Sequence, residues 1–279
     1  MKVSAGIIQK KHRAISLLRE HRAVLVALSG GVDSAALLAI ACEALGPENL
    51  LAVTGRSGAV TEDDIQDAGE VARALKVRHE IVDTLEIERA EYRSNSGDRC
   101  FHCRSALFEV LSRIAAERGY DAIAYGAIVD DLGDDRPGMD AARKMGILAP
   151  LLQAGIGKAD ARQLANDVNL HVHEKPANAC LASRIPIGTE VTPERLTQVG
   201  HAEAALRRLG FRRFRVRHHG EIARIELGDE EADRLVDPGL RAETVRSVKN
   251  AGFRFVAVDL EAYRAGGLYS IEPRRESGQ

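Results

Sequence analysis

The hydrophobic pattern of residues 1–126 alternates between short apolar runs and longer amphipathic stretches. Residues 23–28 form a continuous apolar run of strand length, which is typical of a parallel strand buried on both faces. Further strands are predicted at 51–54, 78–82 and 122–126, with helices at 1–21, 33–45, 62–75 and 103–118. This alternation predicts an α/β fold with a doubly wound parallel sheet that binds ligands at the carboxyl ends of its strands.

The pattern changes in the second half of the chain. From Gly155 to Ile187 the periodicity breaks down around several prolines. A helix follows Thr192-Pro193, and then the order strand, strand, helix, strand is predicted at 214–218, 222–227, 237–250 and 253–258. We therefore predict a first domain over residues 1–187, a small α+β domain over 188–272 and a disordered tail over 273–279.

Composition and charge exclude several classes of protein. Hydrophobic residues make up 45% of the 279 residues and charged residues 29%, as in an ordinary globular protein. No apolar run approaches the roughly 18 residues of a membrane span, and the N-terminus lacks the apolar core of a signal peptide, so we expect a cytoplasmic protein without a membrane partner. The net charge of −2 gives no reason to expect nucleic acid as a partner.

The segment Ser29-Gly30-Gly31-Val32-Asp33-Ser34 joins the first strand to a helix. Glycines allow the backbone to approach a ligand closely, and the amides at a helix start form an anion site. The two serine hydroxyls add neutral donors for phosphate oxygens. No lysine follows the glycines, so the loop is not a Walker A motif. The alternative, a tight turn with a helix cap, would account for Asp33 but not for all four small residues.

Three of the four cysteines suggest chemistry. Cys42 lies in an apolar helical stretch and is expected to be a core residue. Cys100 and Cys103 form a CxxC, and Cys180 stands in a loop of small and polar residues. Basic neighbours favour thiolate over core packing; they are Arg99, His102, Arg104 and Arg184.

Besides three unrelated buried cysteines, the residue types leave four interpretations of these thiols open. Three thiolates can hold a [4Fe–4S] cluster with one open iron, which can carry an extra sulfide. They can form a structural zinc site with His102 or another histidine as fourth ligand. Cys100 and Cys103 can form a redox pair, with Cys180 as an independent nucleophile. Alternatively, Cys180 alone donates sulfur, with its thiolate stabilised by Arg184.

Charged residues mark two further positions. Four carboxylates follow the strand at 122–126, where substrate or Mg²⁺ contact and a solvated turn are both possible readings; they are Asp130, Asp131, Asp134 and Asp135, with Arg136 beside them. On the strand at 214–218, Arg215 and Arg217 point to one face, about 7 Å apart, which suits a phosphate group. The alternative there is a solvated face. For Glu221 and Glu226, substrate contact and pairing with Arg224 cannot be ranked.

The SGGVDS loop resembles the pyrophosphate loop shared by GMP synthetase, NAD synthetase, asparagine synthetase and the tRNA thiolation enzymes. That resemblance implies an adenine nucleotide α-hydrolase-like fold, ATP as cosubstrate and cleavage between the α and β phosphates. It also implies that pyrophosphate and Mg²⁺ are held by Ser29, Gly30, Gly31, Asp33 and Ser34, with Asp33 on the Mg²⁺.

Further segments narrow the resemblance to one family. They are residues 131–138, 149–152 and 180–186, together with Arg215–His218 and Glu221–Leu227. Together they make the chain similar to the LarE family of sulfur transferases, which build the nickel-pincer nucleotide of lactate racemase. The resemblance covers about residues 20–260. It implies adenylation of a carboxylate on a pyridinium dicarboxylate mononucleotide, followed by replacement of AMP with sulfur. It further implies a substrate phosphate site at Ser183, Arg184, Arg215 and Arg217.

One branch of that family sacrifices the sulfur of a single cysteine, and another is thought to use three cysteines around an iron–sulfur cluster. With Cys100, Cys103 and Cys180, this sequence is more similar to the cluster branch. We expect a homo-oligomer, with substrate binding or subunit contact in the small domain, and a separate sulfur donor as a partner. The competing functions are tRNA thiolation, an ammonia-using ATP-dependent ligase and a non-enzymatic nucleotide-binding module. No RNA-binding module is visible in the sequence.

Overall fold

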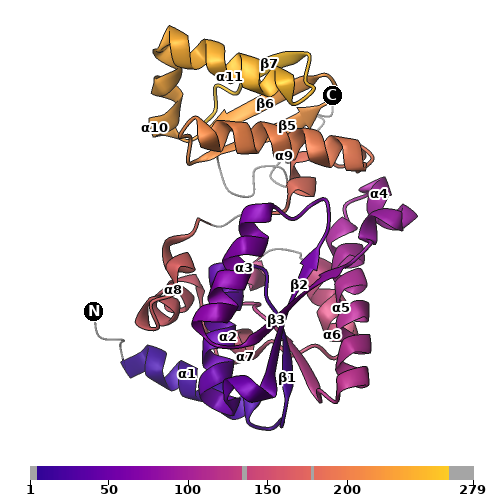
Figure 1. The fold of residues 1–279 in the computed structure, drawn as a ribbon, viewed down its shortest axis with the longest axis vertical. Coiled ribbons are helices and arrows are strands. Elements are labelled where there is room, and N and C mark those ends of the chain that lie inside the picture. Colours follow the sequence, from indigo (N-terminus) through magenta and orange to yellow (C-terminus); the bar gives the residue numbers. More distant parts are fainter. Residues whose placement is uncertain (1–4, 134–136, 177–178, 264–279) are drawn as a thin grey trace, which may run out of the picture. The chain divides into compact units, whose positions relative to one another are not determined.

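The computed structural model describes residues 5–133, 137–176 and 179–263, and the chain divides into two compact units, 1–178 and 179–279 (Figure 1). The division precedes the boundary predicted at residue 187, because the 3-10 helix Leu181–Arg184 packs against helix α9 (Pro193–Arg208) and strand β5 (Phe214–His219) of the second unit. The predicted tail at 273–279 lies outside the described residues.

The first unit contains a four-stranded parallel sheet in the order β3-β2-β1-β4. The strands are β1 (Val24–Ala27), β2 (Leu50–Arg56), β3 (Arg78–Asp83) and β4 (Ala122–Tyr125). Val24 at the start of β1 pairs with Leu50 and with Ala122, so the three central strands begin in register. All four residues of β1 are buried. The predicted α/β fold with a parallel sheet is confirmed.

Helices cover both faces of this sheet (Figure 1). One face packs against α1 (Ala5–Leu18), α2 (Val32–Leu45), α3 (Glu62–Ala74), α7 (Pro150–Gln153) and α8 (Lys158–Asp167). The other face packs against α5 (Arg99–Arg118) and α6 (Pro137–Lys144), and the short α4 (Ala90–Ser94) precedes α5. The apolar side chains of β1 alternate between the two cores, with Val24 and Val26 in one and Leu25 and Ala27 in the other.

Helix α8 lies within residues 155–187, where the sequence pattern predicted no regular element. Gly157 is its N-cap, and the Asp160 carboxylate accepts a hydrogen bond from the Gly157 amide at 3.1 Å. Its buried residues are two alanines and one leucine, namely Ala161, Leu164 and Ala165. Their spacing at i, i+3 and i+4 is helical, but two alanines make a weak apolar signal between a glycine and several prolines.

The second unit is a three-stranded mixed sheet with helices packed against it (Figure 1). Strand β5 pairs antiparallel with β6 (Ile222–Leu227), which pairs parallel with β7 (Phe255–Val258). The helices are α9, the short α10 (Asp229–Ala232) and α11 (Pro238–Asn250). Phe214 and Val216 are buried, and so are Arg215 and Arg217 between and after them, so both faces of β5 are covered. Across the described residues, no helix is both long and apolar enough to cross a membrane.

Candidate active site

The loop Ser29–Ser34 connects the buried strand β1 to the start of α2. Gly31 is the N-cap and has no side chain to accept a hydrogen bond. The backbone N–H groups of the first helical turn can therefore bind a ligand. The Ser34 hydroxyl donates to the Gly31 carbonyl at 3.0 Å and lies 3.1 Å from the Ser29 hydroxyl. Gly30 has φ +71°, a left-handed conformation that favours glycine. The loop therefore has the form of an anion-binding turn.

Asp33 does not cap its helix. One carboxylate oxygen, Oδ2, accepts a hydrogen bond from the Lys158 ammonium at 2.5 Å, and Lys158 is the first residue of α8. The other oxygen, Oδ1, is buried and has no hydrogen-bond partner among the described residues. Burial raises the pKa of Asp33, the Lys158 hydrogen bond and charge oppose that rise, and the Asp131 carboxylate adds to it.

An orphaned carboxylate oxygen near a second carboxylate suits a hard divalent cation. Mg²⁺ prefers oxygen ligands and commonly takes one or two carboxylates together with substrate phosphates. The predicted role of Asp33 as a Mg²⁺ ligand fits this chemistry, because Oδ1 is available at the start of α2. The role itself stays a prediction.

In the acidic loop after β4, two carboxylates accept backbone amides. Asp130 Oδ2 accepts the backbone amide of Lys158 at 2.8 Å, and Asp131 Oδ2 accepts that of Ile128 at 3.0 Å. Asp130 thus helps to hold the start of α8, where Lys158 meets Asp33. The predicted Asp134, Asp135 and Arg136 lie outside the described residues.

Strand β4 ends against the phosphate loop. A Cβ added to Gly126 would lie 2.7 Å from the amide nitrogen of Ser34 and 2.9 Å from the carbonyl carbon of Asp33. The preceding residue, Tyr125, has the guanidinium of Arg104 over its ring, with 5.4 Å between Cζ and the centroid. Arg104 lies on α5. Residues 125 and 126 therefore connect the phosphate loop to the N-terminal part of α5.

Cys100 and Cys103 lie in the N-terminal part of α5, which begins at Arg99 rather than at Cys103 as predicted. Residues three apart on a helix share a face, and a helix N-terminus favours negative charge. Both thiols are half-buried and reduced. Two of the basic neighbours are occupied elsewhere: Arg99 donates to Asn95 Oδ1 at 2.7 Å, and the His102 ring lies 3.1 Å from Asp98.

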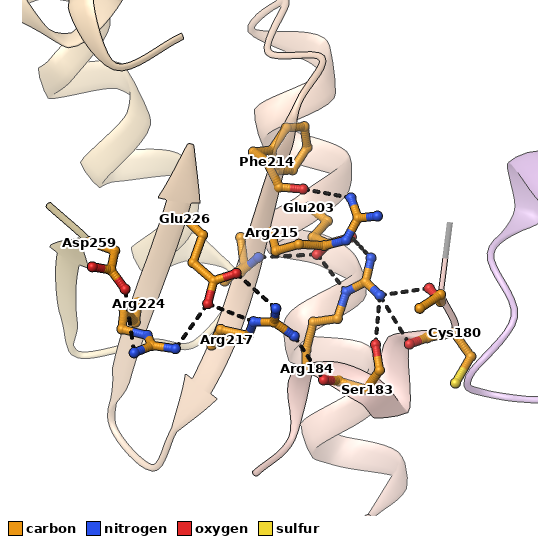
Figure 2. A network of polar contacts seen from close by, with 12 residues as sticks. Cys180, Ser183, Arg184, Glu203, Phe214, Arg215, Arg217, Arg224, Glu226 and Asp259 are labelled. Carbon is orange, nitrogen blue, oxygen red and sulfur yellow. Dashed lines mark hydrogen bonds and ion pairs between the residues drawn. The ribbon is translucent and has the colours of Figure 1, made fainter. Parts of the chain in front are cut away.

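The remaining cysteines have distinct surroundings. Cys42 packs against the core, and burial raises the pKa of its thiol to about 11, so it is an inert residue as expected. Cys180 is exposed, at the start of the second unit. Its carbonyl accepts from Arg184 Nη1 at 3.1 Å, and Figure 2 shows its sulfur directed away from that guanidinium. Arg184 thus contacts the main chain of Cys180, and the alternative in which it stabilises the Cys180 thiolate stays a prediction.

Arg184 is fully buried and holds the Cys180 loop to α9 (Figure 2). Its Nε and Nη2 form a bidentate pair with the buried carboxylate of Glu203, at 2.9 and 3.1 Å. Its Nη1 donates to the Ala179 carbonyl at 2.6 Å and to the Ser183 hydroxyl at 2.8 Å. Glu203 also accepts the amide of Val216 at 3.1 Å. These contacts give Arg184 a structural role, and its predicted contact with a substrate phosphate stays a prediction.

Arg215 and Arg217 are not on a solvated sheet face, because only 9% and 5% of them are exposed. Arg217 forms a bidentate pair with Glu226 at 2.9 and 2.8 Å, and its Nη1 donates to the Ser183 carbonyl at 2.9 Å (Figure 2). Arg215 donates to the Phe214 carbonyl at 2.7 Å and has its guanidinium over the Tyr263 ring. Burial lowers the pKa of Arg215, and the nearby charge of Arg184 lowers it further.

Glu221 and Glu226, for which the sequence did not favour one role, have different surroundings. Glu226 is buried and accepts from both Arg217 and Arg224. Glu221 lies on the exposed turn before β6, 3.4 Å from Arg254. The buried network thus places Arg184, Arg215 and Arg217 in one small region with Glu203 and Glu226, so positive charge is in excess there. Such an excess favours an anion.

Two lysines that the sequence did not single out contact the phosphate loop. Lys158 pairs with Asp33, and Lys175 donates to the Gly30 carbonyl at 3.0 Å. Each is more than 120 residues away from its partner along the chain. Gly157 followed three residues later by Asp160 is a recognisable helix start in the sequence. It could have predicted a helix that begins at Lys158. No local signal points to Lys175.

Comparisons with known proteins agree with this geometry. The NAD synthase family model matches residues 14–114, which include the phosphate loop. The chain is 39% identical to an uncharacterized protein of Synechocystis sp., over 88% of this chain and 92% of that one. It is 34% identical to the pyridinium-3,5-bisthiocarboxylic acid mononucleotide synthase of Lactiplantibacillus plantarum, over 95% of both chains. An NH₃-dependent NAD⁺ synthetase of Methanopyrus kandleri is 42% identical over 24% of this chain and 23% of its own. The chain therefore belongs to the LarE family and is an ATP-dependent enzyme with a pyrophosphate loop.

Proposed function

We propose that this protein adenylates a carboxylate of a pyridinium dicarboxylate mononucleotide and then replaces AMP with sulfur. The relative that covers 95% of the chain is named for the bisthiocarboxylic acid product of such a reaction. The phosphate loop and Asp33 support the activation step. The cysteines support a sulfur nucleophile rather than an ammonia one.

The chemistry requires two displacements. A carboxylate oxygen of the substrate attacks the α-phosphorus of ATP, the bond to the bridging oxygen breaks and pyrophosphate leaves. A sulfide then attacks the carbonyl carbon of the acyl adenylate, and AMP leaves with the electrons of the C–O bond, giving a thiocarboxylate. Ser29, Ser34 and the first amides of α2 hold the leaving pyrophosphate, with Asp33 on Mg²⁺ and Lys158 as a further cation.

The sulfur carrier in this proposal is a [4Fe–4S] cluster held by Cys100, Cys103 and Cys180. The supporting observation is the position of the CxxC at the start of α5, where Arg104 stacks on Tyr125 next to the phosphate loop. Reduced, half-buried thiols on one helix face fit two ligands of such a cluster, and the exposed Cys180 fits a third. A bound cluster with one open iron supplies the sulfide.

The substrate phosphate, in the same proposal, is bound by Ser183, Arg184, Arg215 and Arg217. The excess of positive charge in their buried network supports this assignment, because the charge of Arg184 repels that of Arg215 and lowers its pKa, in addition to the larger effect of burial. A bound phosphate would relieve that repulsion.

Anaerobic purification with iron and acid-labile sulfide analysis tests the cluster. We expect iron and sulfide in the wild-type protein and their loss in Cys100→Ala, with Cys42→Ala as the matched control that keeps both. Wild-type protein without iron under these conditions would exclude the cluster.

The alternative carrier is Cys180 itself, which would give up its sulfur as H₂S and become dehydroalanine. Mass spectrometry of the Cys180 peptide after turnover separates the two carriers: the cluster leaves this residue intact over repeated cycles, whereas sacrifice converts it once.

Pyrophosphate release tests the activation step without reference to the carrier. It should depend on the carboxylated nucleotide, and supplied sulfide should yield a thiocarboxylate where ammonia yields no amide. Pyrophosphate release that does not depend on the carboxylated nucleotide would count against adenylation of that substrate.

We further propose that the protein is a homo-oligomer and that a separate protein or small molecule donates the sulfur. The molecular mass in solution tests the first part, and labelling of the sulfur tests the second.

A further inference from the structure

Lys175 connects three groups at the back of the phosphate loop. Its ammonium donates to the Gly30 carbonyl at 3.0 Å, to Asp64 Oδ1 at 2.7 Å and to Asp67 Oδ2 at 2.5 Å. An ammonium has three N–H donors, so these contacts use all of them. Only 19% of the lysine side chain is exposed. Burial, the largest single effect, lowers the pKa of Lys175, but the bonds to Asp64 and Asp67 together outweigh it, so the pKa is raised and the group stays charged.

The peptide between Gly30 and Gly31 can turn more freely than any other in the loop. Neither residue carries a side chain, so nothing in the local sequence fixes which way its carbonyl points. In a trans peptide the carbonyl and the following N–H point in opposite directions. Because the Gly30 carbonyl is bound to Lys175, the Gly31 N–H is directed away from Lys175 and is available to a phosphate oxygen.

The same lysine offsets an unfavourable charge. Gly30 lies directly against the start of α3, where an added Cβ would be 2.1 Å from the Asp64 carbonyl oxygen. That helix start is acidic, with Glu62, Asp63 and Asp64 in its first turn and Asp67 one turn later. Carboxylates at this position would repel a bound pyrophosphate if no cation stood between them and the loop.

The main chain of Lys175 is fixed as well. Arg162 of α8 donates to the Lys175 carbonyl at 2.9 Å and to the His173 carbonyl at 2.6 Å. Helix α8 is the element that also brings Lys158 to Asp33. The main chain of Lys175 is therefore held by α8 and not only by the contact of its ammonium with Gly30, as a positioning group requires.

We infer that Lys175 is a positioning residue for the ATP-dependent step: it locks the Gly30–Gly31 peptide with its N–H available to phosphate and neutralises Asp64 and Asp67 behind the loop. This inference rests on ATP binding by the phosphate loop and not on the identity of the sulfur carrier.

Binding of Mg²⁺ with α,β-methylene-ATP, measured by calorimetry on the full chain, tests it. Lys175→Met should weaken binding about 10- to 100-fold, the range for a lost hydrogen bond to a charged group. Lys175→Arg keeps a cation and should recover part of that loss. Lys11→Met is the matched control, because it breaks an ion pair with Glu43 in the same unit and should bind as the wild type does.

A second variant separates positioning from simple structural support. Asp64→Asn with Asp67→Asn removes the carboxylates of both Lys175 ion pairs, and of the Asp67–His171 pair, but leaves Lys175 to hold Gly30. It should therefore bind the probe as tightly as the wild type or more tightly. A merely structural ion-pair cluster requires this double variant to fail as Lys175→Met does, and that result would overturn the inference. Unchanged binding in Lys175→Met would also overturn it. A wild-type protein that does not bind the probe would instead refute the assignment of the loop.

Discussion

The ammonium of Lys158 lies 2.5 Å from Asp33 Oδ2, which joins the first residue of α8 to the second residue of α2 across 125 positions of sequence. The loop that contains Asp33 has no lysine of its own, and this ion pair supplies the cation from elsewhere in the fold. Because Oδ1 of the same carboxylate remains without a partner among the described residues, Asp33 can keep Lys158 on one oxygen and accept a metal on the other.

Replacing Lys158 should therefore impair activation more than folding. Lys158→Met leaves Asp33 half-buried without its cation and removes a positive charge near the leaving pyrophosphate. We expect kcat/KM for pyrophosphate release to fall about 100-fold, the size typical of one lost electrostatic contact at a transition state. Lys158→Arg keeps the charge and should retain more activity. Equal rates for the wild type and Lys158→Met would contradict this role.

Gly126 should tolerate no side chain. Its Cβ would lie 2.7 Å from the Ser34 amide nitrogen, a backbone atom that cannot move without shifting the start of α2. Gly126→Ala should cost about 1–3 kcal/mol of stability, as overpacking does, and should weaken nucleotide binding at the displaced loop. Gly6→Ala in α1 is the control, since a Cβ there meets nothing within 4 Å. Thermal unfolding and calorimetric binding of the ATP analogue measure the two effects, and wild-type values for Gly126→Ala would refute the close approach.

Breaking the Arg184–Glu203 pair should destabilise the second unit. Arg184→Met leaves the fully buried carboxylate of Glu203 with the more distant Arg207 guanidinium, 3.8 Å away, and breaking a buried pair costs about 3–5 kcal/mol. Adding Glu203→Gln removes the buried charge but keeps an acceptor for the Val216 amide, so the double variant should recover part of the loss. Hydrogen exchange in α9 follows this unit within the intact chain. A double variant less stable than Arg184→Met would contradict the argument from buried charge.

Asp121 should make stability depend on pH in the acid range. Its carboxylate accepts the amides of Arg22 and Ala23 at 3.0 and 2.8 Å, and these backbone hydrogen bonds lower its pKa from 3.8 to about 2. A lowered pKa means that the stabilisation is complete above pH 3.8 and is lost as the pH falls towards 2.

Asp121→Asn should therefore be less stable than the wild type near neutral pH. About 1 kcal/mol is expected, because a third of the Asp121 side chain is exposed and solvent screens the interaction. The difference should shrink as the pH is lowered from 5 to 2.5 in urea unfolding. A difference that stays constant over that range would show that ionisation of Asp121 plays no part.

Local patterns in the sequence determined the scaffold and the position of its loop. Apolar runs such as 23–28 are typical of buried strands, and two glycines with two serines before a helix are typical of an anion site. The parallel sheet and the loop at its carboxyl edge were predictable for this reason. The period of two in β5 likewise showed that Arg215 and Arg217 share a face.

The tertiary structure decided what those side chains meet. The sequence could not show that Arg184 pairs with Glu203 and with the backbone of its own loop, or that Asp130 holds the start of α8. Nor could it show that Lys158 and Lys175 contact a loop more than 120 residues earlier. Hydrophobic periodicity indicates which face of a helix or strand is buried, but not which residues that face contacts. Which charge faces which depends on the packing of whole elements, and that packing is fixed by many weak contacts spread over the chain rather than by any short segment.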